Sequence, residues 1–426
     1  MNVKIINGNL LLREGDKYKV TKETLFIKNN EILQVGGKVA NENDFAVFDA
    51  NDKLVMPGLI NMHTHAYMTF LRNYADDVEF DEWLFKRVMP VEDNMPLEAA
   101  YWSSLLGYME MFMTGTTSFV DMHMYLRQAP KAAKQAGIRS FIGRGLVGED
   151  LYTDGYSRFN DSLIELEEYG SDMINIVLSP HAIYTASPRI YEQVAEECRK
   201  RNLLKQTHLS ETVGEVENCI KQHGKTPVEL MRDLGFLDEK TILAHCVQMR
   251  GDDMAIIAES GATVVTNPAS NAKLGNGFAP VVELAAAGCN VALGTDGTAS
   301  NNTLNMFREM GLLTMIQKGI HKSPTVSPAR FCLDTATING AKGLGMQDKL
   351  GVIKAGAKAD IIFIDLNEVS LFPNNDIVTS LVYSANGSEV KDVMVNGEFV
   401  MKNRELLTID KEEVYFNMKK IVAENL

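Results

Sequence analysis

The pattern of apolar and polar positions at the two ends of the chain differs from the pattern in the middle. Near both ends, apolar runs flank Asn-Gly or Asn-Asn pairs, in Lys4–Leu12, Leu25–Leu33 and Asp392–Val400. Such pairs tolerate the positive φ angles of tight hairpin turns, so the pattern predicts paired strands. Ala359–Asp365 predicts one more strand. We therefore expect residues 1–57 and 345–426 to form one small composite β-sandwich domain built from both termini.

Between residues 58 and 344, short apolar runs alternate with longer helical segments, for example Ser187–Arg201 and Pro227–Leu234. The strand candidates are Gly58–His65, Thr117–Asp121, Arg139–Gly145, Ile174–Pro180, Leu204–His208, Thr241–His245, Ala262–Asn267 and Val291–Asp296. This alternation predicts an α/β fold, a TIM-type (β/α)8 barrel that forms the catalytic domain. The alternative, an open doubly wound sheet, needs a Gly-x-Gly-x-x-Gly turn that the sequence lacks.

The composition and net charge of the chain limit the kinds of partner that we expect. Apolar residues make up 45% of the 426, and 42 Lys and Arg against 56 Asp and Glu give a net charge of −14. An acidic surface repels phosphate backbones, so we expect no nucleic-acid partner. The sequence has no run of eighteen apolar residues, no apolar signal segment and no Cys-x-x-Cys pair. We expect a cytoplasmic protein without a membrane partner, and a homo-oligomer is left open.

Histidines and an aspartate fall at the carboxyl ends of predicted strands, where barrel enzymes do their chemistry. His63 and His65 alternate on one strand, so both rings point the same way. The pair alone is a weak signal, because two buried core histidines would give the same pattern. His208 and Asp296 end two further strands and complete the three or four nitrogen and oxygen ligands of a catalytic metal. The sequence predicts one divalent metal per subunit, zinc or iron.

Two more polar residues lie near this predicted site. Glu211 follows His208 by three residues and could move a proton between a metal-activated water and the substrate. A solvated loop glutamate is the alternative. His245 ends the sixth predicted strand and could orient the water or the substrate, or it could be a structural core histidine.

Several motifs resemble the amidohydrolase superfamily. They are Pro57-Gly-Leu-Ile-Asn-Met-His63-Thr-His65, Thr207-His208-Leu-Ser-Glu211, His245 and Gly294-Thr-Asp296-Gly. Four further motifs resemble its branch of 5-methylthioadenosine/S-adenosylhomocysteine deaminases: Glu82-Trp83-Leu-Phe, Pro90-Val-Glu92-Asp, Ser179-Pro180-His181 and Asp296-Gly-Thr-Ala-Ser300-Asn-Asn. The likeness covers nearly the whole chain. Triazine chlorohydrolases and guanine deaminases share much of this layout.

The resemblance assigns roles to residues one by one. It implies a metal held by His63, His65, His208 and Asp296, with Glu211 as proton shuttle and His245 beside it. Substrate contacts are implied for Glu92 on the ribose hydroxyls, for Arg144 and Arg158 on an amino-acid tail, and for His181 and Ser300. Trp83 offers an aromatic face for a planar base, although core packing explains it equally well.

The predicted reaction is hydrolytic deamination at C6 of an adenine nucleoside, which gives an inosine-type nucleoside and ammonia. Glu211, His245 and Asp296 are the predicted catalytic residues. The sequence does not rank S-adenosylhomocysteine, 5′-methylthioadenosine, adenosine and 5′-deoxyadenosine. One alternative is a related hydrolase of a triazine or guanine. Another, from a different class, is a non-catalytic assembly protein on the same scaffold.

Overall fold

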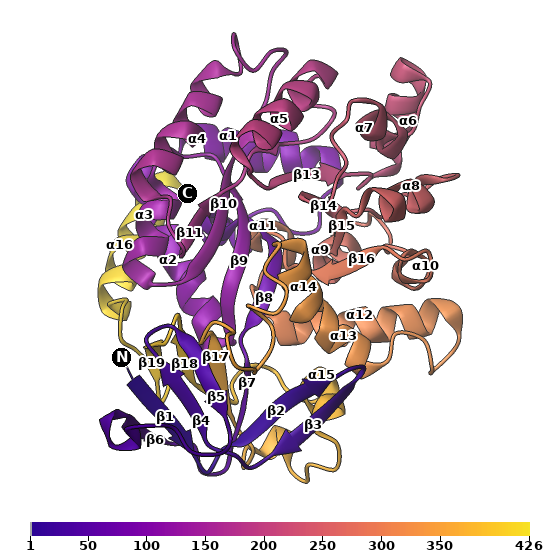
Figure 1. The fold of residues 1–426 in the computed structure, drawn as a ribbon. Helices are drawn as coiled ribbons and strands as arrows, with labels where there is room; N and C mark the ends of the chain where they lie inside the picture. The colour runs from indigo at the N-terminus through magenta and orange to yellow at the C-terminus, as the bar shows by residue number, and fades with distance from the viewer. Residues whose placement is uncertain (1) are drawn as a thin grey trace.

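The structure is a computed structural model that describes residues 2–426 as a mixed α/β molecule with parallel strands at its centre (Figure 1). One parallel sheet has the order β11-β10-β9-β8, and β12 also pairs with β10. The other has the order β13-β14-β15-β16. The strands are β8 (Leu59–Thr64), β9 (Thr116–His123), β10 (Arg139–Leu146), β11 (Ile174–Ile176), β12 (Ser179–Pro180), β13 (Lys205–Leu209), β14 (Thr241–His245), β15 (Thr263–Thr266) and β16 (Asn290–Leu293).

The two parallel sheets meet on one side where the chain between β11 and β12 lies beside β13. The backbone N–H of Leu178 donates to the carbonyl of Leu204 at 3.1 Å, and the N–H of Gln206 donates to the carbonyl of Leu178 at 3.1 Å. Leu178 also forms a parallel bridge with Lys205. Strand pairing therefore continues from the first sheet into the second.

The sheets meet again where the end of β16 lies beside β8. The backbone N–H groups of Thr295 and Asp296 donate to the carbonyl of His63 at 3.1 and 2.9 Å. Gly294 makes this approach possible, because a Cβ there would lie 2.9 Å from both the backbone nitrogen and the carbonyl oxygen of His63. This close approach brings Asp296 to the histidines of β8.

Helices and short helical turns surround the parallel strands (Figure 1). Local signals set their ends: Thr226 and Glu229 form a capping box at the start of α7, and Asn202 adopts a left-handed conformation after α5. The elements are η2 (Ala66–Leu71), η3 (Glu82–Val88), α1 (Met89–Asn94), α2 (Leu97–Met113), α3 (Gln128–Ala136), α4 (Tyr156–Tyr169), α5 (Pro188–Arg201), α6 (Val213–His223), α7 (Pro227–Asp233), α8 (Asp253–Ser260), α9 (Pro268–Lys273), α10 (Val281–Ala286), α11 (Thr298–Asn301), α12 (Met306–His321), α13 (Ala329–Thr335), α14 (Ile338–Gly343), α15 (Ile377–Tyr383) and α16 (Lys411–Asn425).

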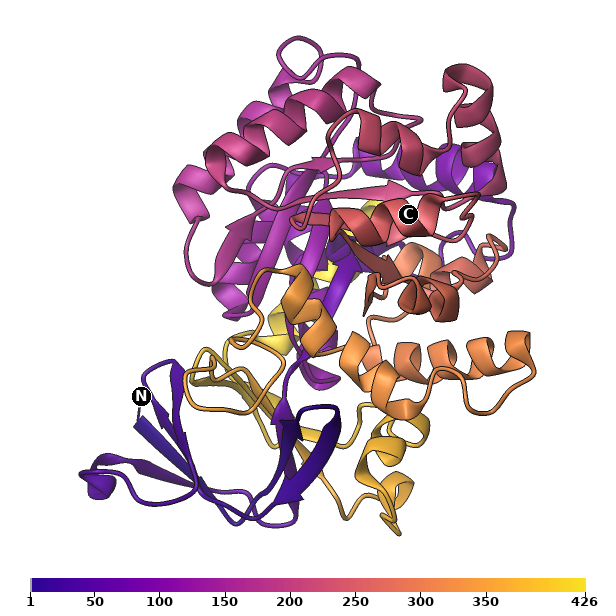
Figure 2. The same ribbon diagram turned by 45° about the vertical axis from the view of Figure 1, so that its right-hand side comes forward.

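Strands from both ends of the chain lie side by side below the parallel sheets (Figure 2). A seven-stranded sheet has the order β20-β19-β18-β17-β7-β2-β3, and a four-stranded sheet has the order β5-β4-β1-β6. Their apolar inner faces share one core. The strands are β1 (Asn2–Ile6), β2 (Asn9–Glu14), β3 (Lys17–Thr21), β4 (Leu25–Lys28), β5 (Glu31–Val35), β6 (Ala46–Asp49), β7 (Lys53–Pro57), β17 (Ile361–Asp365), β18 (Val390–Val395), β19 (Glu398–Lys402) and β20 (Glu405–Leu406), with turns η1 (Glu42–Asp44) and η4 (Val369–Leu371).

A buried ion pair links the two parts. Arg139, at the start of β10, donates from Nε to Asp360 Oδ2 at 2.6 Å and from Nη2 to Asp360 Oδ1 at 3.1 Å. Asp360 directly precedes β17. Both side chains are buried, and this bidentate geometry satisfies charges that would be costly to leave alone.

Two of the three predicted hairpins are present. Asn29 and the Asn396–Gly397 pair have positive φ and join β4 to β5 and β18 to β19 as antiparallel pairs. Asn7 also has positive φ, but the hairpin predicted there is wrong, because β1 and β2 belong to different sheets. Here the turn passes the chain from one sheet to the other.

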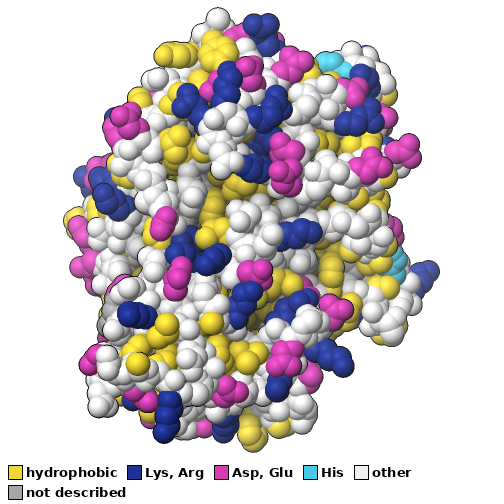
Figure 3. Space-filling model, in the orientation of Figure 1, with side chains coloured by type: hydrophobic (Ala, Val, Ile, Leu, Met, Phe, Trp, Pro, Cys, Tyr) yellow, Lys and Arg dark blue, Asp and Glu magenta, His cyan; other side chains and the backbone are white. Residues whose placement is uncertain are grey.

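The predicted strands of the middle are all present, with ends that differ by a few residues. The predicted strand Ile174–Pro180 is not continuous but consists of two short strands, β11 and β12. Within residues 2–426, no helix combines the length and apolar character needed to cross a bilayer. On the face shown in Figure 3, basic and acidic side chains are interspersed.

Candidate active site

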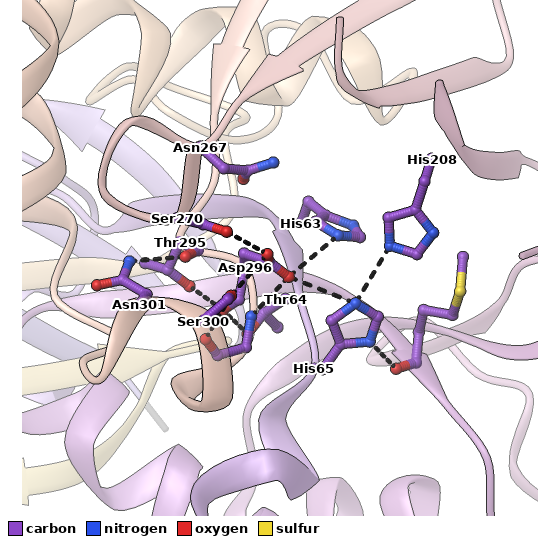
Figure 4. A network of polar contacts seen from close by, with 12 residues as sticks. His63, Thr64, His65, His208, Asn267, Ser270, Thr295, Asp296, Ser300 and Asn301 are labelled. Carbon is purple, nitrogen blue, oxygen red and sulfur yellow. Dashed lines mark hydrogen bonds and ion pairs between the residues drawn. The ribbon is translucent and has the colours of Figure 1, made fainter. Parts of the chain in front are cut away.

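Three histidines and one aspartate converge at the carboxyl ends of the parallel strands (Figure 4). His63 Nε2 and His65 Nε2 lie 3.6 and 3.4 Å from Asp296 Oδ1, and His65 Nε2 lies 3.2 Å from His208 Nε2. Ligand atoms of His63, His65 and His208 all lie within 4.8 Å of one another, as do those of His63, His245 and Asp296. The structure thus brings together the four residues predicted as metal ligands.

Backbone carbonyls fix the ring orientation of two of these histidines. His65 Nδ1 lies 2.7 Å from the carbonyl oxygen of Met122, and His208 Nδ1 lies 2.7 Å from that of His181. A carbonyl oxygen only accepts, so each Nδ1 must carry the proton. With the proton on Nδ1, the Nε2 atom of each imidazole presents a lone pair toward the other ring.

Burial favours the neutral forms of His63 and His208, whereas the neighbouring histidines favour the ionised form of Asp296. Burial lowers the pKa of His63 to about 4 and holds the pKa of His208 well below its ordinary value. For Asp296, burial raises the pKa, but the nearby rings of His63, His65 and His245 outweigh it and hold the pKa well below its usual range. Neutral imidazole and ionised carboxylate are the forms that bind a metal.

The donor set fits a divalent metal. Both ring nitrogens of His63 are buried without a hydrogen-bond partner, an arrangement that is costly unless a ligand satisfies them. A cation placed among three imidazole nitrogens and one carboxylate would satisfy these lone pairs together. The described residues could therefore hold a divalent metal ion.

Glu211 and His245 lie next to this group. His245 Nε2 is 3.8 Å from Glu211 Oε2, and both side chains are buried. Burial raises the pKa of Glu211. Burial lowers the pKa of His245, but the negative charges of Glu211 and Asp296 outweigh it and raise that pKa. A carboxyl group with a raised pKa can both hold and deliver a proton near neutral pH.

A cavity of about 390 Å³ opens above these groups. Its wall includes His65, His208, Glu211, His245 and Asp296. The rest of the wall is rich in aromatic and methionine side chains and also contains the charged residues Glu92, Asp93 and Arg158. A volume of this size fits a small organic molecule.

Besides Glu211, four predicted substrate residues line this cavity: Trp83, Glu92, His181 and Arg158. The indole N–H of Trp83 donates to the carbonyl of Ala299 at 3.2 Å, which holds the ring in the wall. Glu92 is buried and accepts a hydrogen bond from the hydroxyl of Tyr67. Burial lowers the pKa of His181 to about 3, so its ring is neutral.

The two predicted tail-binding arginines are placed differently. Arg158 lines the cavity and donates to the carbonyl of Gly145 at 2.9 Å. Arg144 is not among the residues that line the cavity, and it is held by Asp161 and by the carbonyl of Met124 at 2.7 Å.

Ser300 also lies behind the cavity wall. Its hydroxyl donates to Asp296 Oδ2 at 2.8 Å, so in this structure it supports the aspartate. His123 at the end of β9 lies 3.3 Å from Glu165 and does not line the cavity.

Sequence reasoning missed residues that hold the predicted groups in place. Ser270 donates to Asp296 Oδ2 at 2.6 Å, Asn271 Oδ1 lies 2.8 Å from His245 Nδ1, and Tyr67 binds Glu92. The segment Asn267-Pro-Ala-Ser-Asn271 lies at the end of a predicted strand and could have indicated two of them. Polar residues at the ends of predicted strands were the signal that located His208 and Asp296.

Comparison with known proteins identifies the family of this chain. The model of the amidohydrolase family matches residues 54–400. The chain belongs to the amidohydrolase family. The resemblance of the motifs to this superfamily and to its deaminase branch is confirmed. The 5-methylthioadenosine/S-adenosylhomocysteine deaminase of Caldanaerobacter subterraneus subsp. tengcongensis is 39% identical over 429 residues, covering 100% of this chain and 99% of the relative.

Solved structures agree with the fold. A zinc-bound adenosine deaminase from Xanthomonas campestris has a TM-score of 0.92 and 29% identity, covering 99% of this chain and 98% of the neighbour. An atrazine chlorohydrolase from Arthrobacter aurescens, complexed with zinc, has a TM-score of 0.91 at 22% identity, covering 99% of this chain and 100% of the neighbour. The second likeness concerns the fold alone.

Proposed function

We propose that this amidohydrolase is a metal-dependent deaminase that hydrolyses the C6–N bond of adenine nucleosides, with S-adenosylhomocysteine and 5′-methylthioadenosine as substrates. The observation that carries this proposal is that one cavity is lined by predicted metal ligands, by Glu211 and by the buried carboxylate of Glu92. The relative that matches over 99% of its own length bears the name of that deaminase. A non-catalytic assembly protein would have no need of this combination.

In this proposal, His63, His65, His208 and Asp296 hold one divalent metal per subunit, and we propose zinc. Three neutral imidazoles and a carboxylate are an ordinary zinc donor set, and two zinc-bound structures share the fold. When bound there, the metal supplies Lewis acidity and makes a water molecule nucleophilic near neutral pH.

The chain's own residues handle the protons. Glu211 carries a proton in its raised-pKa state and gives it to ring N1, which makes C6 more electrophilic. Asp296 orients the attacking water and accepts its proton. Asp296 passes that proton to the leaving amine, which departs as ammonia, and Glu211 regains its proton from the hydroxyl group left on C6. His245 lies beside Glu211 and stabilises the oxygen that becomes negative at C6.

The remaining cavity residues hold the nucleoside. Glu92 can accept hydrogen bonds from two ribose hydroxyls, because an ionised carboxylate offers two acceptor oxygens. Trp83 offers a flat wall for the adenine ring. Arg158 offers a planar fork for the α-carboxylate of an amino-acid tail, with Arg144 behind it. His181 completes the substrate side of the site, and Ser300 supports Asp296 from behind the cavity wall.

We further propose that β8 to β16 form one closed (β/α)8 barrel over residues 58–344. The backbone hydrogen bonds at both junctions of the parallel sheets support closure. Residues 1–57 and 345–426 then form the composite β domain, which the sheet built from both ends supports.

The test is an ammonia-release screen with zinc-loaded protein. Adenosine, 5′-methylthioadenosine, S-adenosylhomocysteine, guanine and a chlorotriazine are supplied separately, and the chlorotriazine reaction is followed by the release of chloride. We expect release from the adenine nucleosides and none from guanine or the triazine. Release from guanine or the triazine alone would contradict the proposal.

A further inference from the structure

One short stretch of chain contacts three of the groups proposed to carry the chemistry. Residues 266–276 contain α9 and are called the α9 segment below. Within it, Ser270 donates to Asp296 Oδ2 at 2.6 Å, Asn271 Oδ1 lies 2.8 Å from His245 Nδ1, and the Asn276 amide donates to Glu211 Oε1 at 2.8 Å. All three are buried, and they are not among the residues that line the cavity. They therefore act through other side chains.

The contact with His245 decides which ring nitrogen carries the proton. As the amide is oriented, Asn271 presents its oxygen, which accepts only, at 2.8 Å from His245 Nδ1. The Asn267 amide nitrogen is farther from the same atom, at 3.4 Å, so the nearer contact favours a proton on Nδ1. The Nε2 atom, which faces Glu211 at 3.8 Å, is then the atom that can gain or lose a proton. Without Asn271, the ring loses both its preferred tautomer and its fixed plane.

The contacts with Asp296 and Glu211 fix the carboxylates. Asp296 Oδ2 receives hydrogen bonds from Ser270 and Ser300, which leaves Oδ1 turned toward His63 and His65. The Asn276 amide holds Glu211 by Oε1, and Oε2 is the oxygen nearer His245.

The α9 segment is itself held from behind. Glu309 on α12 is fully buried and accepts from the backbone N–H of Ala269 at 3.0 Å and from the side chain of Asn301 at 2.9 Å. Asn301 belongs to α11, the helix that also carries Ser300. One carboxyl group therefore ties together the two segments that support Asp296.

We propose that the α9 segment is a positioning device in which Ser270, Asn271 and Asn276 orient Asp296, His245 and Glu211, respectively. This inference deepens the proposed function and rests on it for the reaction that is measured. Ser270 sets the metal-binding geometry of the aspartate. Asn271 and Asn276 set the proton-transferring groups and leave metal binding untouched.

The test compares Ser270→Ala, Asn271→Leu and Asn276→Ala with Asn290→Ala. Asn290 is a matched control, because its amide also makes two hydrogen bonds, to Thr263 and to the Asn339 carbonyl, at the far end of β16. We expect Asn271→Leu and Asn276→Ala to lower kcat about 10–100-fold with little change in KM. Asn290→Ala should lower the melting temperature with near-normal kcat.

A second measurement does not depend on activity. The metal-free proteins are titrated with zinc against a competing chelator. Ser270→Ala should lower the zinc affinity about 10-fold or more, whereas Asn271→Leu and Asn276→Ala should match wild type. Equal zinc affinity in Ser270→Ala and wild type would overturn the role given to Ser270.

Two further variants separate positioning from general damage. Asn271→Asp keeps the acceptor toward His245 and should restore most of the lost kcat. In a His245→Ala background, Asn271→Leu should have no further effect, because the group that it orients is gone. Additive losses, or no rescue by Asn271→Asp, would overturn the inference. If wild type releases no ammonia, the proposed function fails, and the zinc titration still tests Ser270.

Discussion

His65 and His208 direct their Nε2 atoms at each other across 3.2 Å, while each Nδ1 donates to a backbone carbonyl. Two lone pairs at this distance repel unless a proton or a cation lies between them. Burial disfavours a proton on His208, whose pKa lies well below its ordinary value. A shared cation would resolve the conflict and would also satisfy His63 and Asp296.

Glu211→Gln should keep the metal and lose turnover. The amide retains the shape of the side chain but cannot deliver and recover a proton, so kcat should fall about 10²–10⁴-fold. Ammonia release and metal content are measured on the same preparation. Glu217→Gln, at an exposed position on α6, is the control and should remain active. Near-normal turnover in Glu211→Gln would remove this residue from the mechanism.

Glu92→Ala should weaken the recognition of ribose. A hydrogen bond to a charged group contributes about 1.5–3 kcal/mol, so kcat/KM should fall at least about 10-fold for adenosine. The fall should be smaller for 2′-deoxyadenosine, which lacks one of the hydroxyls. The measurement is kcat/KM for both substrates in wild type and variant. An equal loss for the two substrates would show that Glu92 does not bind the 2′-hydroxyl.

Arg158→Ala should discriminate between substrate tails. Since Arg158 lines the cavity, its loss should lower kcat/KM for S-adenosylhomocysteine about 10-fold or more and spare 5′-methylthioadenosine, which has no carboxylate. Arg144→Ala provides the comparison, because that side chain is bound to Asp161 behind the cavity wall. If only Arg144→Ala changed the preference, the tail would bind where the structure shows no open cavity.

Stability should fall as the pH rises through the range in which Glu309 ionises. Burial raises the pKa of Glu309 from 4.5 to about 7 in the folded state. The folded protein therefore holds a proton that the unfolded chain releases, and this contribution is lost between about pH 4.5 and 7. The difference corresponds to about 3 kcal/mol. Urea unfolding at pH 5 and 7.5 measures it.

Glu309→Gln mimics the protonated carboxyl, so the variant should lose less stability than wild type between those two pH values. Glu412→Gln, exposed in the first turn of α16, should behave as wild type. An unchanged pH dependence in Glu309→Gln would show that this carboxyl is already ionised at pH 5.

Features carried by local periodicity could be predicted from the sequence. Alternation on a strand places His63 and His65 on the same side, and the end of a strand locates His208 and Asp296. These signals work because strand ends of a parallel sheet share one edge. The hairpin at Asn396–Gly397 follows from local φ preferences in the same way.

Features set by distant contacts could not be predicted in this way. The turn at Asn7 has the expected φ, but whether it joins paired strands depends on the partners of β1 and β2. The resemblance implies a contact with the substrate tail for both Arg144 and Arg158, and the packing of Asp161 against Arg144 separates them in the structure. Ser270 is separated from its partner Asp296 by 26 positions in the sequence, and Asn276 is separated from Glu211 by 65.

The central claim is tested most directly by diffraction from crystals of zinc-loaded protein, recorded on both sides of the zinc absorption edge. The account predicts one anomalous peak at about 2.0–2.2 Å from nitrogens of His63, His65 and His208 and an oxygen of Asp296. Absence of a peak at this position at full zinc loading, or a peak bound by other residues, would contradict it.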